Sequence, residues 1–218
     1  MRCIASANDS KEKKEMLQKT KKLSTLQLTE MAILLALVVV LQSISSVGVV
    51  TLCLCLVPIT LGSIVLDWKC GGILGFAFGI VAIFWGIIGK DVFTLYLFQA
   101  SPIMTILICV VKGTLAGMVP AFVYSALNKR FGSLIASIAA AICAPIVNTG
   151  VFAIGCIIIK NDVISVAGKL GIEAANFMVL LFGVLITANF FVELMINVVF
   201  APSLNKVATI VGQRIKKH

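Results

Sequence analysis

Charged side chains are scarce in this chain, and histidine is nearly missing. Only 12% of the 218 residues are charged, against about 25% in typical soluble proteins. The one histidine is His218, and the seven cysteines include no CxxC pair. A metal site needs clustered ligands, and a disulfide framework needs paired cysteines. The sequence therefore indicates neither, and we expect most cysteines to act as small buried apolar residues.

The chain also has little that could perform catalysis. The segment from Gly86 to Lys90 lacks the GxxxxGK[ST] spacing of a phosphate-binding loop, so we expect no ATPase activity in this chain itself. At membrane depth we expect no histidine and a single acid, Glu193. We therefore predict no catalytic residue, no cofactor and no enzyme activity.

The chain is instead rich in long apolar segments. Hydrophobic residues make up 60% of it, and its mean hydropathy is +1.11. This composition predicts an all-α, polytopic membrane protein, with six transmembrane helices in one bundle within the lipid bilayer. The spans are expected at about 26–45, 50–66, 71–89, 102–127, 132–159 and 177–201. Each can cross a hydrocarbon core of about 30 Å, the second only barely.

The basic residues predict the orientation. A lysine-rich tail (residues 1–25) precedes the membrane domain (26–205), and a basic tail (206–218) follows it. With the N-terminus inside, 14 basic residues fall on the cytoplasmic side and three outside, and Lys112 falls within the membrane. Because basic residues favour the cytoplasmic side, both termini are predicted to be cytoplasmic. The same bias explains the net charge of +9 without a nucleic-acid partner.

Lys112 is the one charged residue in the apolar run from Ser101 to Leu127. It lies about 15 Å along a helix from Pro102, close to the membrane midplane. A central lysine costs about 2.5–3.5 kcal/mol, so such residues usually face a cavity, an ion pair or a ligand. Lys112 is interpreted as the countercharge for an anionic ligand. The alternatives are a structural carboxylate partner, for which Glu193 is the candidate, or a lysine that snorkels to an interface.

Two further segments place polar groups near the same depth. Pro145 predicts that the fifth helix kinks or opens near Asn148 and Thr149, and Asn148 is about as deep as Lys112. In the sixth helix Asn189 is level with them. These residues are candidate ligand contacts, although a structural amide bond between helices would also explain Asn148. Pro202 is expected to end the sixth span before a short interfacial helix.

The two longest polar interruptions, Lys90–Ser101 and Lys160–Asn176, are expected outside the membrane, where they are interpreted as lids over the ligand. Tyr96 and Gln99 of the first, with the nearby Trp85, are candidate ligand contacts. The aromatic residues could equally belong to the interfacial belt of the membrane.

Small residues recur four positions apart in several predicted helices, which allows close approach of helix backbones. Together with the six spans and the lysine-rich N-terminus, the AxxxA of Ala32 and Ala36, the charged Lys112 before Gly113-x-x-x-Gly117, and APIVNTGVF in the fifth helix resemble the S components of energy-coupling factor vitamin transporters. The resemblance implies a vitamin ligand and a transmembrane T subunit that docks on Ala32 and Ala36. It also implies two cytoplasmic ATPases and a location in a bacterial plasma membrane.

Within that family, Lys112 and Asn148 are most similar to the polar pair of pantothenate-binding members. Pantothenate has one carboxylate for one cation, and hydroxyl and amide groups for an asparagine. Folate, riboflavin or another small molecule stay open as ligands. A small channel or an assembly subunit that transports nothing stays open as a different class of function.

Overall fold

The computed structural model describes residues 25–47, 50–51, 54–172 and 176–217. The predicted N-terminal tail (1–25) therefore lies outside the described residues except for Thr25. The described part is helical apart from one pairing of two-residue strands. Its elements in order are α2 (Thr25–Ser45), β1 (Ser46–Val47), β2 (Val50–Thr51), α3 (Leu56–Val65), α4 (Trp68–Ile88), α5 (Val92–Ala100), α6 (Pro102–Phe131), α7 (Ser133–Ile158), α8 (Lys160–Lys169), the π-helix η1 (Val179–Ile186) and α9 (Thr187–Lys217).

Five helices of the described part are long and apolar enough to cross a membrane: α2, α4, α6, α7 and α9. This confirms the prediction of an all-α protein with several membrane spans. The predicted span over 50–66 is not confirmed, because α3 has only ten residues. At 1.5 Å per residue it is about 15 Å long, half of a hydrocarbon core. α3 is nevertheless buried inside the bundle, where it packs against α4, α6 and α9.

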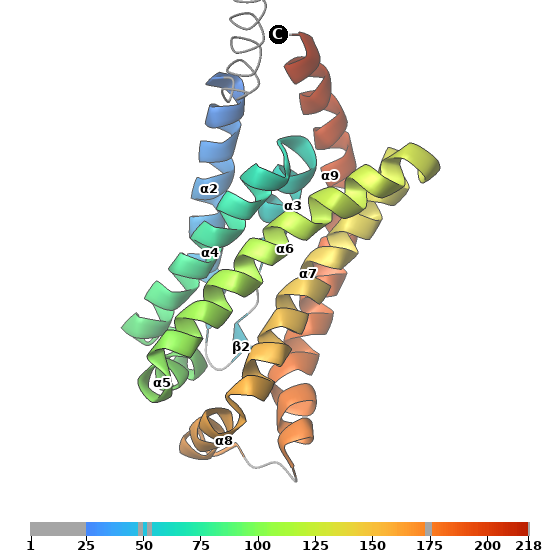
Figure 1. Cartoon of the computed structure of the whole chain (residues 1–218). Helices are drawn as coiled ribbons and strands as arrows, with labels where there is room; N and C mark the ends of the chain where they lie inside the picture. The colour runs from blue at the N-terminus through green and yellow to red at the C-terminus, as the bar shows by residue number, and fades with distance from the viewer. Residues whose placement is uncertain (1–24, 48–49, 52–53, 173–175, 218) are drawn as a thin grey trace, which may run out of the picture.

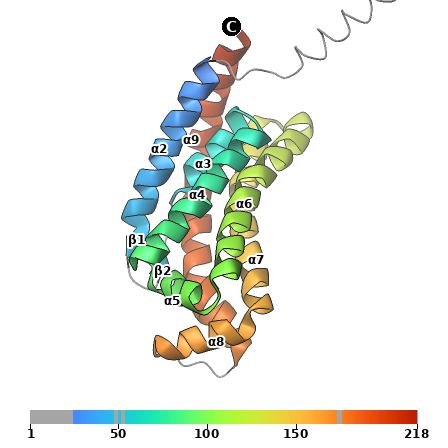
Figure 2. The same cartoon turned by 60° about the vertical axis from the view of Figure 1, so that its left-hand side comes forward.

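The connections gather at two opposite ends of the bundle (Figures 1 and 2). One end holds the start of α2, the α3–α4 and α6–α7 connections, and the end of α9. The other end holds the β1–β2 pair, α5 and α8. The strands are antiparallel, with Ser46 opposite Thr51 and Val47 opposite Val50.

α4 and α6 pack backbone to backbone through glycines. A Cβ added to Gly75 would lie 2.0 Å from the Gly113 carbonyl oxygen, and one added to Gly117 would lie 2.0 Å from the Gly71 carbonyl oxygen. No side chain fits between the helices at these positions. The predicted glycine spacing therefore sets this contact, which fixes the rotation of α6 and with it the direction of the neighbouring Lys112.

Both predicted lids contain a helix. Asp91 caps α5 by accepting hydrogen bonds from the backbone N–H and the hydroxyl of Thr94 at 3.1 and 2.6 Å. Asp162 in the first turn of α8 accepts a hydrogen bond from the Ser101 hydroxyl, at the junction of α5 and α6. Apolar residues of α5 and α8 then join one buried cluster with α6, α7 and η1: Phe93, Leu97, Ile108, Ala153, Cys156, Ile159, Val163, Val166, Ala167, Phe177, Leu180 and Leu181.

Neither proline interrupts its helix. α7 continues as a helix through Pro145, so it does not open near Asn148. The prediction that the last span ends at Pro202 is wrong, because α9 continues to Lys217. A proline removes one backbone hydrogen bond, and membrane helices tolerate this loss when neighbouring groups satisfy the freed carbonyl. The predicted interfacial helix is therefore the last part of α9.

Candidate ligand site

Lys112 extends from α6 toward α7. Its ammonium lies 5.1 Å from the centroid of the Phe152 ring, and the residue is half-buried. A cation over an aromatic face gains about 0.5–2 kcal/mol, the upper end applying where water is excluded. The lysine therefore faces the α6–α7 contact within the bundle.

Asn148 lies on the same face of α7 as Phe152, because the two are four residues apart. Asn148 is 5% exposed, and its side-chain amide oxygen Oδ1 is buried with no hydrogen-bond partner in the part of the chain that the structure describes. A buried polar group left without a partner costs about 1–3 kcal/mol, so this oxygen is a strong candidate to accept from a ligand. Thr149, the next residue, is half-buried and points about 100° away around the helix.

α9, which packs against α7, carries further buried polar residues. Glu193 is 2% exposed and Asn197 is fully buried, and the Asn197 amide donates to the Glu193 backbone carbonyl at 2.9 Å. Because the donor in this bond must be the side-chain nitrogen of Asn197, the other end of the amide is its oxygen Oδ1. This oxygen is buried and has no hydrogen-bond partner among the described residues. Asn189, one turn before Glu193, is partly buried and likewise has a buried carbonyl oxygen that no described group contacts by a hydrogen bond.

α5 connects to the site through stacked aromatic rings. Phe152 packs edge to face on the buried Phe93 of α5, with ring centroids 6.2 Å apart and an interplanar angle of 67°. Tyr96 is half-buried and packs against the same cluster as Phe152. Gln99, in the last turn of α5, is exposed. Of the two predicted residues of this lid, Tyr96 therefore adjoins the site and Gln99 faces away from the core.

Trp85 lies far from Lys112 along α4. Gly75 packs beside Gly113, and Trp85 is ten residues further along α4, about 15 Å away. Its ring is instead covered by Lys90, whose ammonium lies 3.8 Å from the ring centroid. The structure thus places Trp85 at the end of α4 beside α5.

Ala32 and Ala36, the predicted docking residues, are exposed on α2. Only 17% of the membrane-crossing segment of α2 is buried inside the chain, against 39% for α4 and α7. The small-residue face of α2 is therefore open for another helix.

The described residues contain no group of three or more His, Cys, Asp or Glu that could hold a metal ion. Cys55, Cys70, Cys109, Cys143 and Cys156 are free thiols. The groups gathered from α5, α6, α7 and α9 are thus one cation, one carboxylate, several side-chain amide oxygens and aromatic rings.

Sequence reasoning missed two features of the site. Phe152 is an ordinary residue of an apolar helix, and only the register of α6 against α7 reveals it as the neighbour of Lys112. The hydrogen bond between Ser101 and Asp162 joins residues 61 positions apart, and no local pattern signals it.

Comparison of the chain with protein-family models, curated proteins and solved structures found no match.

Proposed function

We propose that this chain is the substrate-capture subunit of an energy-coupling factor transporter. In this proposal it lies in a bacterial plasma membrane with both termini in the cytoplasm. It binds pantothenate from outside and delivers it inward with a transmembrane T subunit and two ATPases. The observation that carries the proposal is the contact of Lys112 with Phe152, on the α7 face that also holds the buried Asn148.

Lys112, Phe152 and Asn148 lie where α6 meets α7, and we call this region the Lys112 seam. Its chemistry supports a ligand with one negative charge and several hydrogen-bond donors. A carboxylate forms charge-assisted hydrogen bonds with an ammonium worth about 1.5–3 kcal/mol, so it competes with the Phe152 ring for Lys112. The Asn148 carbonyl oxygen accepts from a hydroxyl or amide N–H. Pantothenate supplies these groups, whereas riboflavin has no carboxylate and folate has two.

The placement of α5 and α8 supports entry from their end of the bundle. These two helices cover the site through the cluster that contains Phe93 and Val163, and they are held together by Ser101 and Asp162. The exposed Ala32 and Ala36 face supports docking of a T subunit, because small residues let helix backbones approach closely.

Native mass spectrometry of the purified chain, followed by calorimetric titration, tests the proposal. We expect a retained small molecule with the mass of pantothenate, and saturable binding of pantothenate in preference to riboflavin and folate. A chain that retains nothing and binds none of the three would contradict the proposal and favour an assembly subunit.

A further inference from the structure

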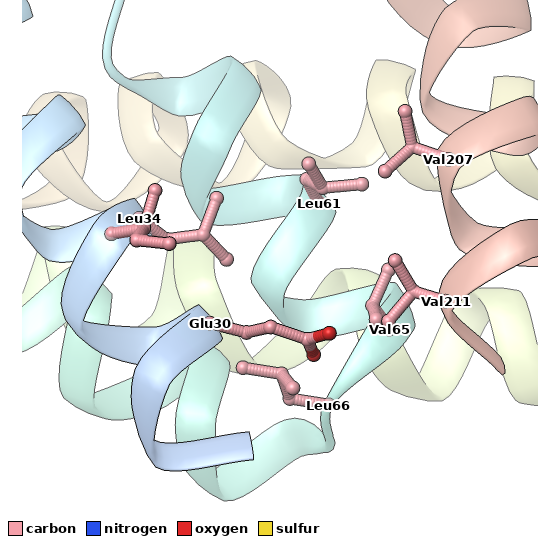
Figure 3. A pocket seen from close by; sticks show the side chains of 8 residues that line it. Glu30, Leu34, Leu61, Val65, Leu66, Val207 and Val211 are labelled. Carbon is pink, nitrogen blue, oxygen red and sulfur yellow. The ribbon is translucent and has the colours of Figure 1, made fainter. Parts of the chain in front are cut away.

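α9 lines two separate regions of the molecule. Its last part, with Val207 and Val211, lines an apolar pocket of about 140 Å³ beside Glu30 of α2 (Figure 3). Asn197 lies ten residues before Val207, about 15 Å away along the helix. Asn197 is fully buried, and its oxygen Oδ1 has no hydrogen-bond partner among the described residues. Because a buried acceptor without a partner is costly, this oxygen is a candidate to accept from a ligand.

Two contacts give the register of α9 against α7. The Ser137 hydroxyl donates to Asn205 Oδ1 at 3.3 Å. One turn nearer to the α5–α8 end, Ala141 and Ala201 are both fully buried in one apolar cluster. The two helices run in opposite directions (Figure 1). Asn197 is one further turn along and shares a face of α9 with Ala201, so it lies at the α7–α9 contact.

Asn148 approaches the same place from α7. It is seven residues from Ala141 and therefore on the face of α7 that packs against α9. Side chains in a helix lean toward its N-terminus. Because the helices are antiparallel, Asn148 and Asn197 lean toward each other, and the hydrogen bond from the Asn197 amide to the Glu193 backbone carbonyl follows this direction. Two buried oxygens, both hydrogen-bond acceptors, thus lie in one layer.

The distance from this layer to Lys112 suits the proposed ligand. Pro145 is one turn from Ala141 and so is level with Asn197. Phe152, which lies beside the Lys112 ammonium, is seven residues further along α7, or about 10 Å away. Extended pantothenate has about the same length, roughly 10 Å, between its carboxylate and its terminal hydroxyl. A ligand whose carboxylate lies at Lys112 therefore brings a hydroxyl donor to Asn197.

We propose that Asn197 determines ligand specificity by accepting a hydrogen bond from the terminal hydroxyl of pantothenate. This role rests on the proposed function, in which Lys112 binds the carboxylate. The ligand then lies along α7, with its charged end toward α5 and α8 and its hydroxyl end between α7 and α9. A site that bonds a hydroxyl rejects analogues without one, because its buried acceptor would stay unpaired.

Asn197→Leu separates this role from a structural one. Leucine has a similar size and removes the unpaired acceptor, so the ligand-free protein should melt at the wild-type temperature or higher. The affinity for pantothenate in calorimetric titration should fall about fivefold. Asn205→Leu is the matched control on the same helix. It breaks the existing bond with Ser137, so it should lower the melting temperature and leave the affinity at the wild-type level.

A ligand analogue supplies a second test that leaves the protein unchanged. The wild type should bind pantothenate without its terminal hydroxyl at least fivefold more weakly than pantothenate, and Asn197→Leu should bind both equally. Equal affinity of the wild type for both compounds, or wild-type affinity in Asn197→Leu, would overturn the role of Asn197 alone. A lower melting temperature of ligand-free Asn197→Leu would do the same. No binding of pantothenate by the wild type would overturn the proposed function as well.

Discussion

Lys112 holds its ammonium over the Phe152 ring inside an apolar bundle, so its replacement tests what the charge is for. If the charge serves a ligand, Lys112→Ala should fold normally and lose about 2 kcal/mol of binding free energy for pantothenate, roughly thirtyfold in affinity. Calorimetric titration measures the affinity, and a thermal melt measures the fold.

A structural role makes the opposite forecast. If Lys112 neutralises the buried Glu193, Lys112→Ala should lower the melting temperature by leaving a carboxylate uncompensated, and Lys112→Met with Glu193→Gln should restore it. Normal pantothenate affinity in a stable Lys112→Ala protein would remove the lysine from the site, and the pantothenate assignment with it.

Asn148 should contribute less than the lysine, because a neutral amide forms weaker hydrogen bonds than a charged group. Asn148→Ala is expected to weaken pantothenate binding by about 1–2 kcal/mol, or about five- to thirtyfold. Ser137→Ala is the matched control, since Ser137 is also buried in α7 but bonds to Asn205 at 3.3 Å away from the site. An equal loss in both variants would indicate a general effect on α7 and not a ligand contact.

At the residue scale, the sequence predicted those features that stand out against an apolar background. Lys112 and Asn148 are polar residues in apolar runs, and the structure places both on the α6–α7 seam. Glu30 is a further acid inside an apolar run that the prediction of a single acid at membrane depth overlooked. Phe152 could not be predicted, because its role depends on which α7 residue meets Lys112.

At the scale of elements, the hydropathy pattern predicted four of the five long helices within a few residues, and α9 was the exception. The expected spans 71–89 and 132–159 correspond to α4 and α7, and the span 102–127 corresponds to α6, which runs on to Phe131. Lys129 and Arg130 in the last turn favour this extension, because cations stabilise the carboxyl end of a helix.

The same pattern could not separate spanning from buried helices. Hydropathy reports burial without saying whether lipid or protein surrounds a segment, so α3 resembled a span although its neighbours are other helices. The short helices α5 and α8 were expected only as loops. Helices of nine or ten residues are too short to be stable alone, and their packing on the bundle stabilises them.

The glycine contact between α4 and α6 predicts a sharp difference between two similar substitutions. Gly75→Ala would force the helices apart, since its Cβ would lie 2.0 Å from the Gly113 carbonyl oxygen, and should cost about 1–3 kcal/mol of stability. Gly150→Ala is the control, because a Cβ there would meet no atom within 4 Å and alanine favours a helix. Thermal melts in detergent should therefore show a lower midpoint for Gly75→Ala only; equal midpoints would contradict this account of the α4–α6 contact.

The hydrogen bond between Ser101 and Asp162 predicts that α5 and α8 open together. Cys156 is fully buried beneath them, so the rate of its reaction with N-ethylmaleimide reports opening. Ser101→Ala removes one net hydrogen bond of about 1 kcal/mol and should raise this rate about fivefold. Peptide mass spectrometry measures the rate, with Cys143 as an internal reference.

Ser137→Ala serves as the control for this experiment, because it breaks a bond at the opposite end of α7. Faster labelling of Cys156 in both variants would point to general loosening and against a specific tie between α5 and α8. Slower labelling when pantothenate is added would link opening of these helices to the ligand.

At the scale of the whole molecule, the two ends differ in character. One end is covered by α5 and α8, and the opposite end, where α4 begins and α6 ends, carries Lys69, Lys129 and Arg130. α2 runs between these ends along the edge of the bundle, with most of its surface unburied (Figure 2). In the proposed function, the ligand enters at the end covered by α5 and α8, and the partner docks on the side of α2.

The open face of α2 leads to a prediction that separates ligand capture from transport. Ala36→Trp places a bulky ring where a partner helix would approach, so the complex with the T subunit and ATPases should be lost and uptake should stop. Pantothenate binding by the isolated chain should stay at the wild-type level, because Ala36 is exposed on α2 and does not face the interior of the bundle. Phe76→Trp, on the exposed face of α4, should affect neither property. Co-purification with the co-expressed T subunit measures assembly, and an intact complex in Ala36→Trp and in the equivalent Ala32→Trp would show that the partner docks elsewhere.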